Sequence, residues 1–201
     1  GFGDQLKVSR GIGGQLGGIN APSIINCAFN ARQFWDGRAM SLEDQAQGPV
    51  ENPVEMTTDA NGSAWVRAIG RIRLIDGYAK QFPLAFGTPP TRDTVAKAIA
   101  TFERTVLSGN SIADRAEAAM RARTGGRRVE PAVGDFASVL SAAVASGDGA
   151  ALKALGLSAT DEGALSQAAE RLARGRALFF GKARCNGCHG GENFTDNQFH
   201  N

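Results

Sequence analysis

The 201-residue chain is poor in the residues that many metal proteins and membrane proteins need. It contains only three cysteines and two histidines, and this small number disfavours a zinc site, which takes four Cys or His ligands. No stretch approaches the roughly 18 uninterrupted apolar residues that predict a membrane span. We therefore expect a chain without a transmembrane helix.

The chain also lacks a strong excess of charge of either sign. It has 22 basic and 20 acidic residues, which leaves a net charge of +2. Its one Arg-rich region, residues 121–128, contains glycines and no aromatic residues, so it is more typical of a solvated linker than of a nucleic-acid-binding surface. We expect no nucleic-acid partner.

Strand-like alternation of apolar and polar residues is missing as well, whereas helical periodicity is clear. Ser63 can cap a helix, a shorter helix over 78–86 is expected to be interrupted at Pro83, and a third helix begins at Thr91 or Asp93. A strong helix is predicted over 164–180. The sequence therefore predicts a mostly α fold. The apolar faces expected for the first, third and fourth of these helices are Val66, Ile69, Ile72 and Leu74; Val95, Ile99, Phe102 and Val106; and Leu165, Ala169, Leu172 and Phe179.

Two segments do not show this periodicity. The Gly-rich run over 11–18 predicts a loop, and it is not a phosphate-binding loop because no apolar strand precedes it and Pro22 follows where a helix should run. Residues 110–158 are rich in Ala, Arg and Gly, with one helical stretch near 136–144. That composition favours a surface linker or an insertion between domains.

The most specific motif is Cys185-Asn186-Gly187-Cys188-His189. The pattern C-x-x-C-H is the attachment signature of haem c, because two thiols two residues apart can each form a thioether with a haem vinyl group. The adjacent histidine then donates a nitrogen to the iron. The helix that ends shortly before Cys185 resembles the N-terminal helix of the cytochrome c fold. We expect one covalent haem c here, with His189 as an iron ligand.

Other interpretations of this motif are weaker. A thioredoxin-like redox pair is expected in a βαβ setting, which is missing, and a chance match in a structural turn is less expected after such a helix. Haem c is attached on the outer side of the bacterial cytoplasmic membrane, which predicts a periplasmic protein. The third cysteine, Cys27, has no partner and is expected to be a small buried residue.

Several further segments are more particular than composition requires. They are Asn20 to Ser23, Phe34 to Ala39, Ser41 to Ala46, Pro49, Asn52 to Met56, Thr105 to Ser111 and Asn193 to Asn201. Together they resemble the bacterial dihaem cytochrome c peroxidase family, which also contains the dihaem enzyme that matures methylamine dehydrogenase. The resemblance covers about residues 8–115 and 163–201.

The resemblance implies two cytochrome c-like domains, both incomplete in this chain. Residues 1–109 would be part of the N-terminal, peroxidatic domain, 110–158 a linker or insertion, and 159–201 the start of the C-terminal, electron-accepting domain. The first haem motif of the family would lie just before Gly1. We therefore expect a fragment that carries one of the two haems of its parent protein and is inactive alone.

The same resemblance implies roles for four side chains. Glu55 resembles the acid/base that moves a proton between the peroxide oxygens. Gln45 resembles the amide that orients the peroxide, and Trp35 the indole between the two haems. Asn20 resembles a side-chain ligand of a calcium ion, which prefers oxygen donors. Taken singly, each of these residues is interpreted more simply as a capping, surface or core residue. Only their joint placement within the resemblance makes them candidate site residues.

The expected activity is the reduction of hydrogen peroxide to water, with electrons from a small cytochrome c or a cupredoxin. Two alternatives stay open at this point. One is a dihaem oxidase that modifies another protein, and the other is a simple electron-transfer cytochrome c. Members of the family often dimerise, so a homodimer is possible.

Overall fold

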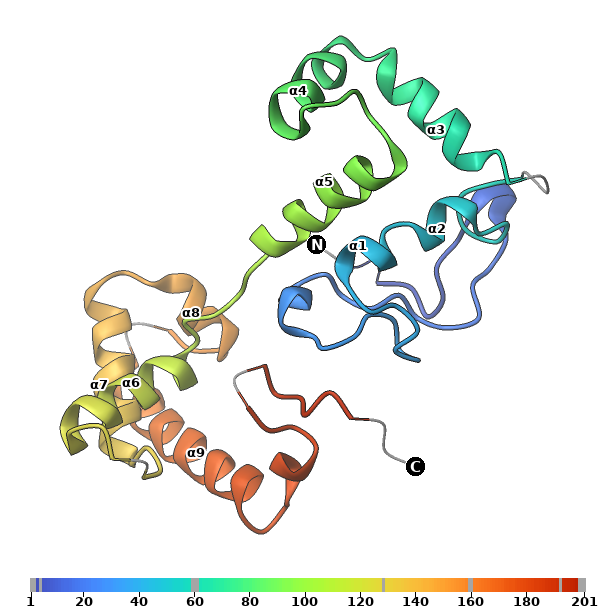
Figure 1. Cartoon of the computed structure of the whole chain (residues 1–201). Helices are drawn as coiled ribbons and strands as arrows, with labels where there is room; N and C mark the ends of the chain where they lie inside the picture. Colours follow the sequence, from blue (N-terminus) through green and yellow to red (C-terminus); the bar gives the residue numbers. More distant parts are fainter. Residues whose placement is uncertain are drawn as a thin grey trace. The chain divides into compact units, whose positions relative to one another are not determined.

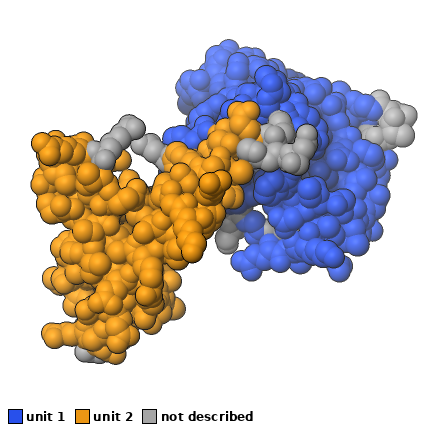
Figure 2. Space-filling view, turned by 90° about the horizontal axis from the view of Figure 1, so that it is seen from below, with its two compact units in different colours: residues 1–108 blue, residues 109–201 orange. Residues whose placement is uncertain are grey.

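The computed structural model describes residue 3 and the ranges 5–58, 62–127, 129–158, 161–191 and 193–198. In these residues the chain is mostly helical, as predicted, and its only β structure is two isolated bridges, Arg10 with Leu16 and Gln33 with Ala39. The chain divides into two compact units, residues 1–108 and 109–201 (Figures 1 and 2).

The first unit begins with irregular chain and two short 3-10 helices, followed by five α-helices. The elements are η1 (Ile12–Gly14), η2 (Cys27–Phe29), α1 (Leu42–Gln45), α2 (Gly48–Glu51), α3 (Ala64–Arg73), α4 (Asp76–Phe86) and α5 (Arg92–Thr105). The start of α5 agrees with the sequence prediction, because Thr91 caps it by accepting a hydrogen bond from the Thr94 amide.

The buried face of α5 differs from the predicted apolar stripe. Val95 and Val106 are buried, but Ile99 and Phe102 are 39% and 56% exposed. The buried face is instead made by the small residues Ala96 and Ala100, and the helix meets α1 and η2 there. Alanines allow neighbouring chain segments to approach closely, so this helix buries its small residues and leaves larger apolar ones outside.

Two predictions for α3 and α4 were also wrong in part. In α3 the described cluster is built on Trp65, with Ile69 and Ile72 packed beside it, while Val66 is exposed. The expected break at Pro83 is absent, because α4 begins at Asp76 and continues through Pro83 to Phe86. Along it the ring of Tyr78 meets that of Phe82 edge-on, the ring of Phe82 contacts that of Phe86 at a tilt, and Phe82 is buried against Trp65 and Val95.

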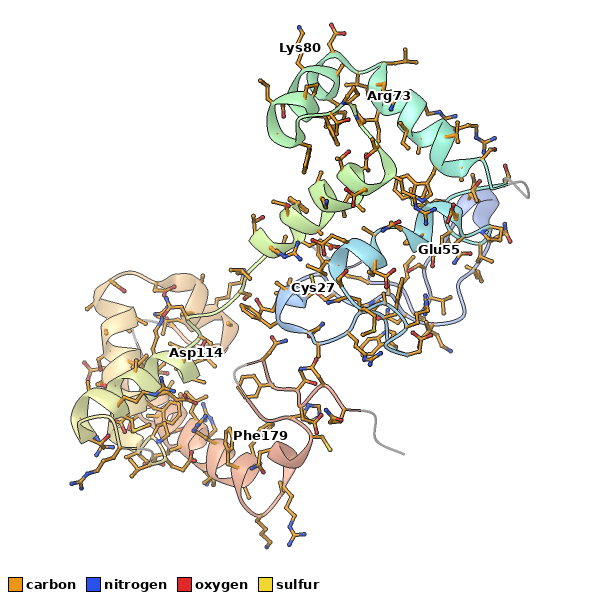
Figure 3. The ribbon with its side chains drawn as sticks, viewed as in Figure 1. Cys27, Glu55, Arg73, Lys80, Asp114 and Phe179 are labelled. Carbon is orange, nitrogen blue, oxygen red and sulfur yellow. The ribbon has the colours of Figure 1, made fainter. Side chains whose placement is uncertain are left out.

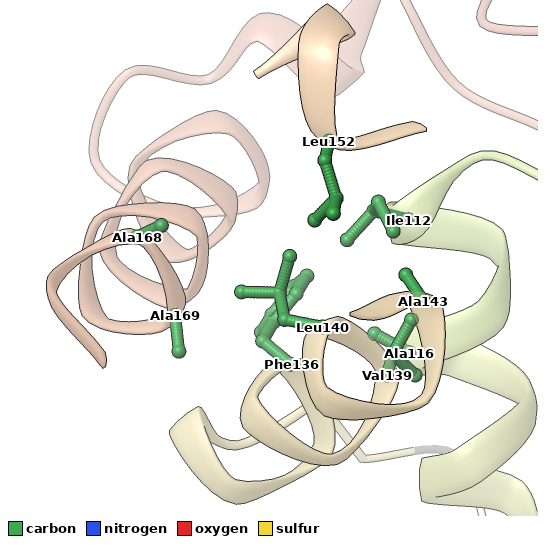
Figure 4. Close-up of a cluster of buried hydrophobic side chains, with 9 residues drawn as sticks. All are labelled: Ile112, Ala116, Phe136, Val139, Leu140, Ala143, Leu152, Ala168 and Ala169. Atoms are coloured by element: carbon green, nitrogen blue, oxygen red, sulfur yellow. The ribbon is translucent and has the colours of Figure 1, made fainter. Parts of the chain in front are cut away.

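The second unit contains α6 (Ile112–Thr124), α7 (Val133–Ala145), α8 (Gly149–Ala154), α9 (Glu162–Phe180) and η3 (Cys185–Gly187). Its core surrounds α7, where Phe136 and Leu140 are each 1% exposed (Figure 4). The predicted inner face of α9 contributes as expected, through buried Ala169 and the partly buried Leu165 and Leu172.

The segment over 110–158, which its composition suggested to be a surface linker or an insertion between domains, belongs to the second unit. It forms α6, α7 and α8, and these helices share one apolar core with α9. The sequence signal was weak because alanines supply much of the buried surface, including Ala116, Ala143 and Ala168. The assignment of the two units to a peroxidatic and an electron-accepting domain stays a prediction.

Candidate functional site

The C-x-x-C-H motif forms a tight turn directly after α9. Arg184 takes a left-handed backbone conformation with φ of 56°, and η3 follows at once. The Cys185 carbonyl then accepts hydrogen bonds from the Cys188 amide at 3.3 Å and from the His189 amide at 2.9 Å. This turn keeps the two thiols and the imidazole close together. Neither cysteine is in a disulfide, and the Cys185 thiol donates a hydrogen bond to the Ala183 carbonyl at 3.8 Å.

The imidazole of His189 is held by one hydrogen bond. Its Nδ1 lies 3.1 Å from the backbone carbonyl oxygen of Phe194. A carbonyl can only accept, so Nδ1 must carry the hydrogen, and the lone pair is left on Nε2. A partner of this kind on the second ring nitrogen is the usual way in which proteins fix the tautomer of a metal-binding histidine.

Aromatic side chains and a backbone bond tie the segment after the motif to the same turn. The ring of Phe194 packs edge-on against Phe179 of α9, with 5.9 Å between the ring centres (Figure 3). The Asp196 amide donates to the Cys188 carbonyl at 3.0 Å. The residues present therefore fit haem c, with two free thiols for the vinyl groups and Nε2 of His189 for the iron. The described residues contain no group of three or more His, Cys, Asp and Glu side chains that could hold a metal ion instead.

In the first unit, Glu55 lies where the Gly-rich loop packs against the segment that follows α2. Its backbone carbonyl accepts a hydrogen bond from the Ile12 amide at 2.9 Å, and the Asn52 carbonyl accepts one from the Glu55 amide at 3.0 Å. Gly11 approaches the Val54 carbonyl so closely that a Cβ atom there would overlap it. The half-buried Glu55 is thus positioned by its backbone on both sides (Figure 3).

Trp35 and Asn20 are joined directly. The indole Nε1 of Trp35 donates to the Asn20 carbonyl at 2.8 Å, and the side-chain amide nitrogen of Asn20 donates to the Leu6 carbonyl at 2.6 Å. The indole is 60% exposed, so this bond and not burial fixes its direction. The role of Asn20 as a calcium ligand stays a prediction.

Gln45 ends α1, whose first turn is capped by Ser41. Its side chain lines a small cavity of about 50 Å³ within the first unit. The cavity lining also includes Cys27, which is buried as expected, and the carboxyl group of Glu103 from α5. The remaining lining residues are Pro22, Ser23, Ile24, Gln33, Phe34 and Leu42.

Sequence reasoning missed Glu103. Its side chain is only 7% exposed, and its Oε2 atom accepts no hydrogen bond from the described protein. A signal was present, because Glu103 follows Ala96 and Ala100 at positions i+7 and i+3 on the small-residue face of α5. That face could be recognised as the buried one only after α1 and η2 were placed against it.

The charge of Arg104 offsets the burial of Glu103 only in part. Burial is the largest influence on the pKa of Glu103 and raises it. The positive charge of Arg104 lowers this pKa, and the negative charge of Glu43 raises it. Arg104 points to Glu43, forming two hydrogen bonds of 2.7 and 3.1 Å, and these bonds lower the pKa of the Glu43 carboxyl. Burial and then the nearby Glu103 raise the pKa of the Cys27 thiol, so Cys27 stays protonated at neutral pH.

Comparison with known proteins identifies the family. The family model described as di-haem cytochrome c peroxidase matches residues 1–121. The chain belongs to this family. It is 40% identical over 109 residues to the cytochrome c551 peroxidase of Pseudomonas aeruginosa, covering 54% of this chain and 31% of that protein. It is 32% identical over 202 residues to the methylamine utilization protein MauG of Methylorubrum extorquens, covering 100% of this chain and 43% of that protein.

A solved structure supports the fold of this family member. The crystal structure of a MauG-like protein associated with microbial copper homeostasis superposes with a TM-score of 0.60 at 22% identity, over 98% of this chain and 46% of that one. The chain spans less than half the length of the curated relatives that it matches. In the part of the chain that the structure describes, no helix is both long and apolar enough to cross a bilayer.

Proposed function

We propose that this chain is part of a periplasmic dihaem peroxidase that reduces hydrogen peroxide to water. Its second unit would carry one covalent haem c, its first unit would supply the peroxide-side residues, and a small cytochrome c or a cupredoxin would donate the electrons. The observation that supports the proposal most is that hydrogen bonds fix the positions of three of the predicted residues in the first unit. Backbone bonds hold Glu55 to the Gly-rich loop, and Trp35 is bonded to Asn20.

In the second unit, this chain's contribution is attachment and orientation. The sulfurs of Cys185 and Cys188 would form the thioethers, and Nε2 of His189 would be the iron ligand, with Nδ1–H held by the Phe194 carbonyl. When bound, haem c supplies an iron centre that exchanges one electron at a time. The electron-accepting role of this unit is part of the same proposal.

In the first unit, the chain's contribution is positioning and proton movement. The Glu55 carboxylate would take the proton from one peroxide oxygen and return it to the other, so that the departing oxygen leaves as water. The Gln45 amide would hydrogen-bond the peroxide and hold it in line with Glu55. The Trp35 indole, oriented by the Asn20 carbonyl, would be a stepping point for the electron.

A dihaem oxidase that modifies another protein is the second candidate. It is supported by the 32% identity to the methylamine utilization protein MauG over 100% of this chain, a coverage that two cytochrome-c peroxidases also reach. A third candidate, an electron-transfer cytochrome c, would need only the haem-binding turn and would make no use of Glu55. A homodimer stays a prediction for all three.

The test is peroxide-dependent oxidation of a reduced donor protein by the haem-loaded full-length protein. We expect Glu55→Gln to lower kcat/KM for peroxide by about a hundredfold or more, because an amide cannot shuttle the proton. The matched control is Glu51→Gln, which removes a carboxylate from the end of α2 that is paired at the surface with Arg92. The control should keep the wild-type rate.

Each candidate gives a different result in this assay. Donor oxidation that needs peroxide and depends on Glu55 supports the peroxidase. Peroxide consumption that is faster with an oxidisable protein substrate than with a donor supports the protein-modifying oxidase. Donor oxidation that is indifferent to peroxide and to Glu55→Gln refutes both and leaves the electron carrier.

A further inference from the structure

The cavity beside Gln45 contains a buried acid that neither the proposed chemistry nor the packing of the unit uses. The Glu103 side chain is 7% exposed and lines the cavity together with Cys27 and Gln45. Its Oε2 atom is buried and accepts no hydrogen bond from any described residue. An ionised carboxylate in such a place is costly, whereas a neutral carboxylic acid is tolerated at much lower cost.

Within the described part of the chain, no cation forms an ion pair with Glu103. Its neighbour in sequence, Arg104, donates two hydrogen bonds to the carboxylate of Glu43 in α1. The facing group from η2 is the Cys27 thiol, which burial and the closeness of Glu103 keep protonated. The net effect of burial, Arg104 and Glu43 is to raise the pKa of Glu103 above its usual range.

The same cavity has the size and the polar groups that water needs. Its volume of about 50 Å³ exceeds the roughly 10–15 Å³ that one water molecule requires. The polar side chains of Ser23, Gln33 and Gln45 line it. Gln33 already donates its side-chain amide to the Cys27 carbonyl at 3.1 Å, whereas the Gln45 amide makes no hydrogen bond within the described part of the chain.

We propose that this cavity is a hydrated proton-holding site, in which Glu103 is kept as a neutral carboxylic acid and water bridges its carboxyl group to the Gln45 amide. The inference rests on the proposed peroxide reduction. Each peroxide needs two protons, and two electrons from the donor protein, to become two water molecules. Glu103 gives its proton to the cavity water, from which it passes towards the peroxide, and regains a proton from solvent water.

This role makes Glu103 a positioning and proton-supplying residue behind Gln45, with which it lines the cavity. It also explains why a carboxyl group stands at the end of the small-residue face of α5, after Ala96 and Ala100. A hydrogen bond from the water would hold the side-chain amide of Gln45 in place, and the Glu103 carboxyl group would hold the water.

Infrared spectroscopy of the haem-loaded full-length protein at neutral pH tests the proposal without measuring turnover. We expect the carbonyl stretching band of a protonated carboxylic acid in the wild type, a prompt shift of that band in D₂O, and loss of the band in Glu103→Gln. Glu103→Asp, which keeps the acid, should retain a displaced band. The matched control Glu51→Gln, which removes an exposed carboxylate, should leave the band unchanged.

The pH profile of turnover adds a functional readout. In the wild type, kcat should fall as the pH rises through the raised pKa of Glu103, because the proton is then lost. Glu103→Gln should show a lower kcat with an unchanged KM for peroxide, and that limb of the profile should disappear. A merely structural role for Glu103 would leave the limb in place.

Three outcomes would overturn the inference: a wild type without the band, a band that survives Glu103→Gln, or a band that exchanges only slowly in D₂O. These outcomes are distinguishable from failure of the proposed function. A protein that shows the band but reduces no peroxide refutes the peroxidase and retains the neutral acid. A protein that reduces peroxide and lacks the band refutes only the proton-holding site.

Discussion

At the scale of single residues, the haem-binding turn and the buried acid show what a sequence can and cannot reveal. Cys185, Cys188 and His189 lie within five consecutive residues, so their spacing alone predicts their chemistry, and the structure adds the Phe194 carbonyl that orients the imidazole. Glu103 lines a cavity together with Cys27 and Gln45, which are distant from it in sequence. Its spacing from Ala96 and Ala100 places it on the small-residue face of α5, but that face can be recognised as buried only once α1 and η2 are packed against it.

Gly11 offers a test of how Glu55 is positioned. In Gly11→Ala the new methyl group would overlap the Val54 carbonyl, so the loop must move and the bond from Ile12 to Glu55 is lost. We expect a loss of about 1–3 kcal/mol in the free energy of unfolding, typical of overpacking, and a lower rate of peroxide reduction. Chemical denaturation and the donor-oxidation assay measure the two effects.

Gly18→Ala is the matched control, because a Cβ atom at Gly18 meets no other atom within 4 Å. It should change neither quantity. If Gly11→Ala were as stable and as active as Gly18→Ala, the close packing of the loop against Val54 would have no part in placing Glu55.

At the scale of elements, the existence and type of the long helices were predictable, and their buried faces were less so. The Thr91 cap and the inner face of α9 follow from local chemistry. The buried face of α5 could not be predicted in this way. The large apolar side chains of Ile99 and Phe102 indicated one face, whereas the close approach of α1 and η2 buries the face that carries Ala96 and Ala100. The same reason explains why an alanine-rich segment resembled a linker and yet forms α6, α7 and α8.

The junction between α6 and α7 depends on one carboxyl group. Asp135 accepts hydrogen bonds from Arg123 of α6 at 2.9 and 2.8 Å, and from the Ala132 amide at the start of α7 at 2.7 Å. The bonds from Arg123 are the main reason why the pKa of Asp135 lies below its usual value of 3.8. Its ionised form is therefore bound more tightly in the folded state than in the unfolded state.

The sign of the pH effect follows from that lowered pKa. The stability that Asp135 contributes is present above its ordinary pKa and is lost as the pH falls through the lower folded value. Asp135→Asn should therefore speed amide hydrogen exchange in α7 at neutral pH, and the difference from the wild type should shrink in acid. Glu170→Gln, at an exposed site on α9, is the control and should match the wild type at every pH. A difference that grows in acid would contradict the assignment.

At the scale of the whole molecule, the chain consists of two helical units with separate cores. The first unit holds Asn20, Trp35, Gln45 and Glu55, and the second holds the haem-binding turn. The family match covers residues 1–121 and so includes all of the first unit. That the first unit reacts with peroxide and the second binds haem c for electron transfer stays a proposal.

The account depends most on covalent haem at Cys185 and Cys188, and one measurement tests it directly. The full-length protein is produced in a host that attaches haem c and is digested under denaturing conditions. The mass of the peptide that contains residues 185–189 is then measured by mass spectrometry. We predict that this peptide carries the mass of one haem, and that the mass is lost when both cysteines are changed to alanine. An unmodified peptide from the wild-type protein would contradict the haem assignment and the proposed electron transfer with it.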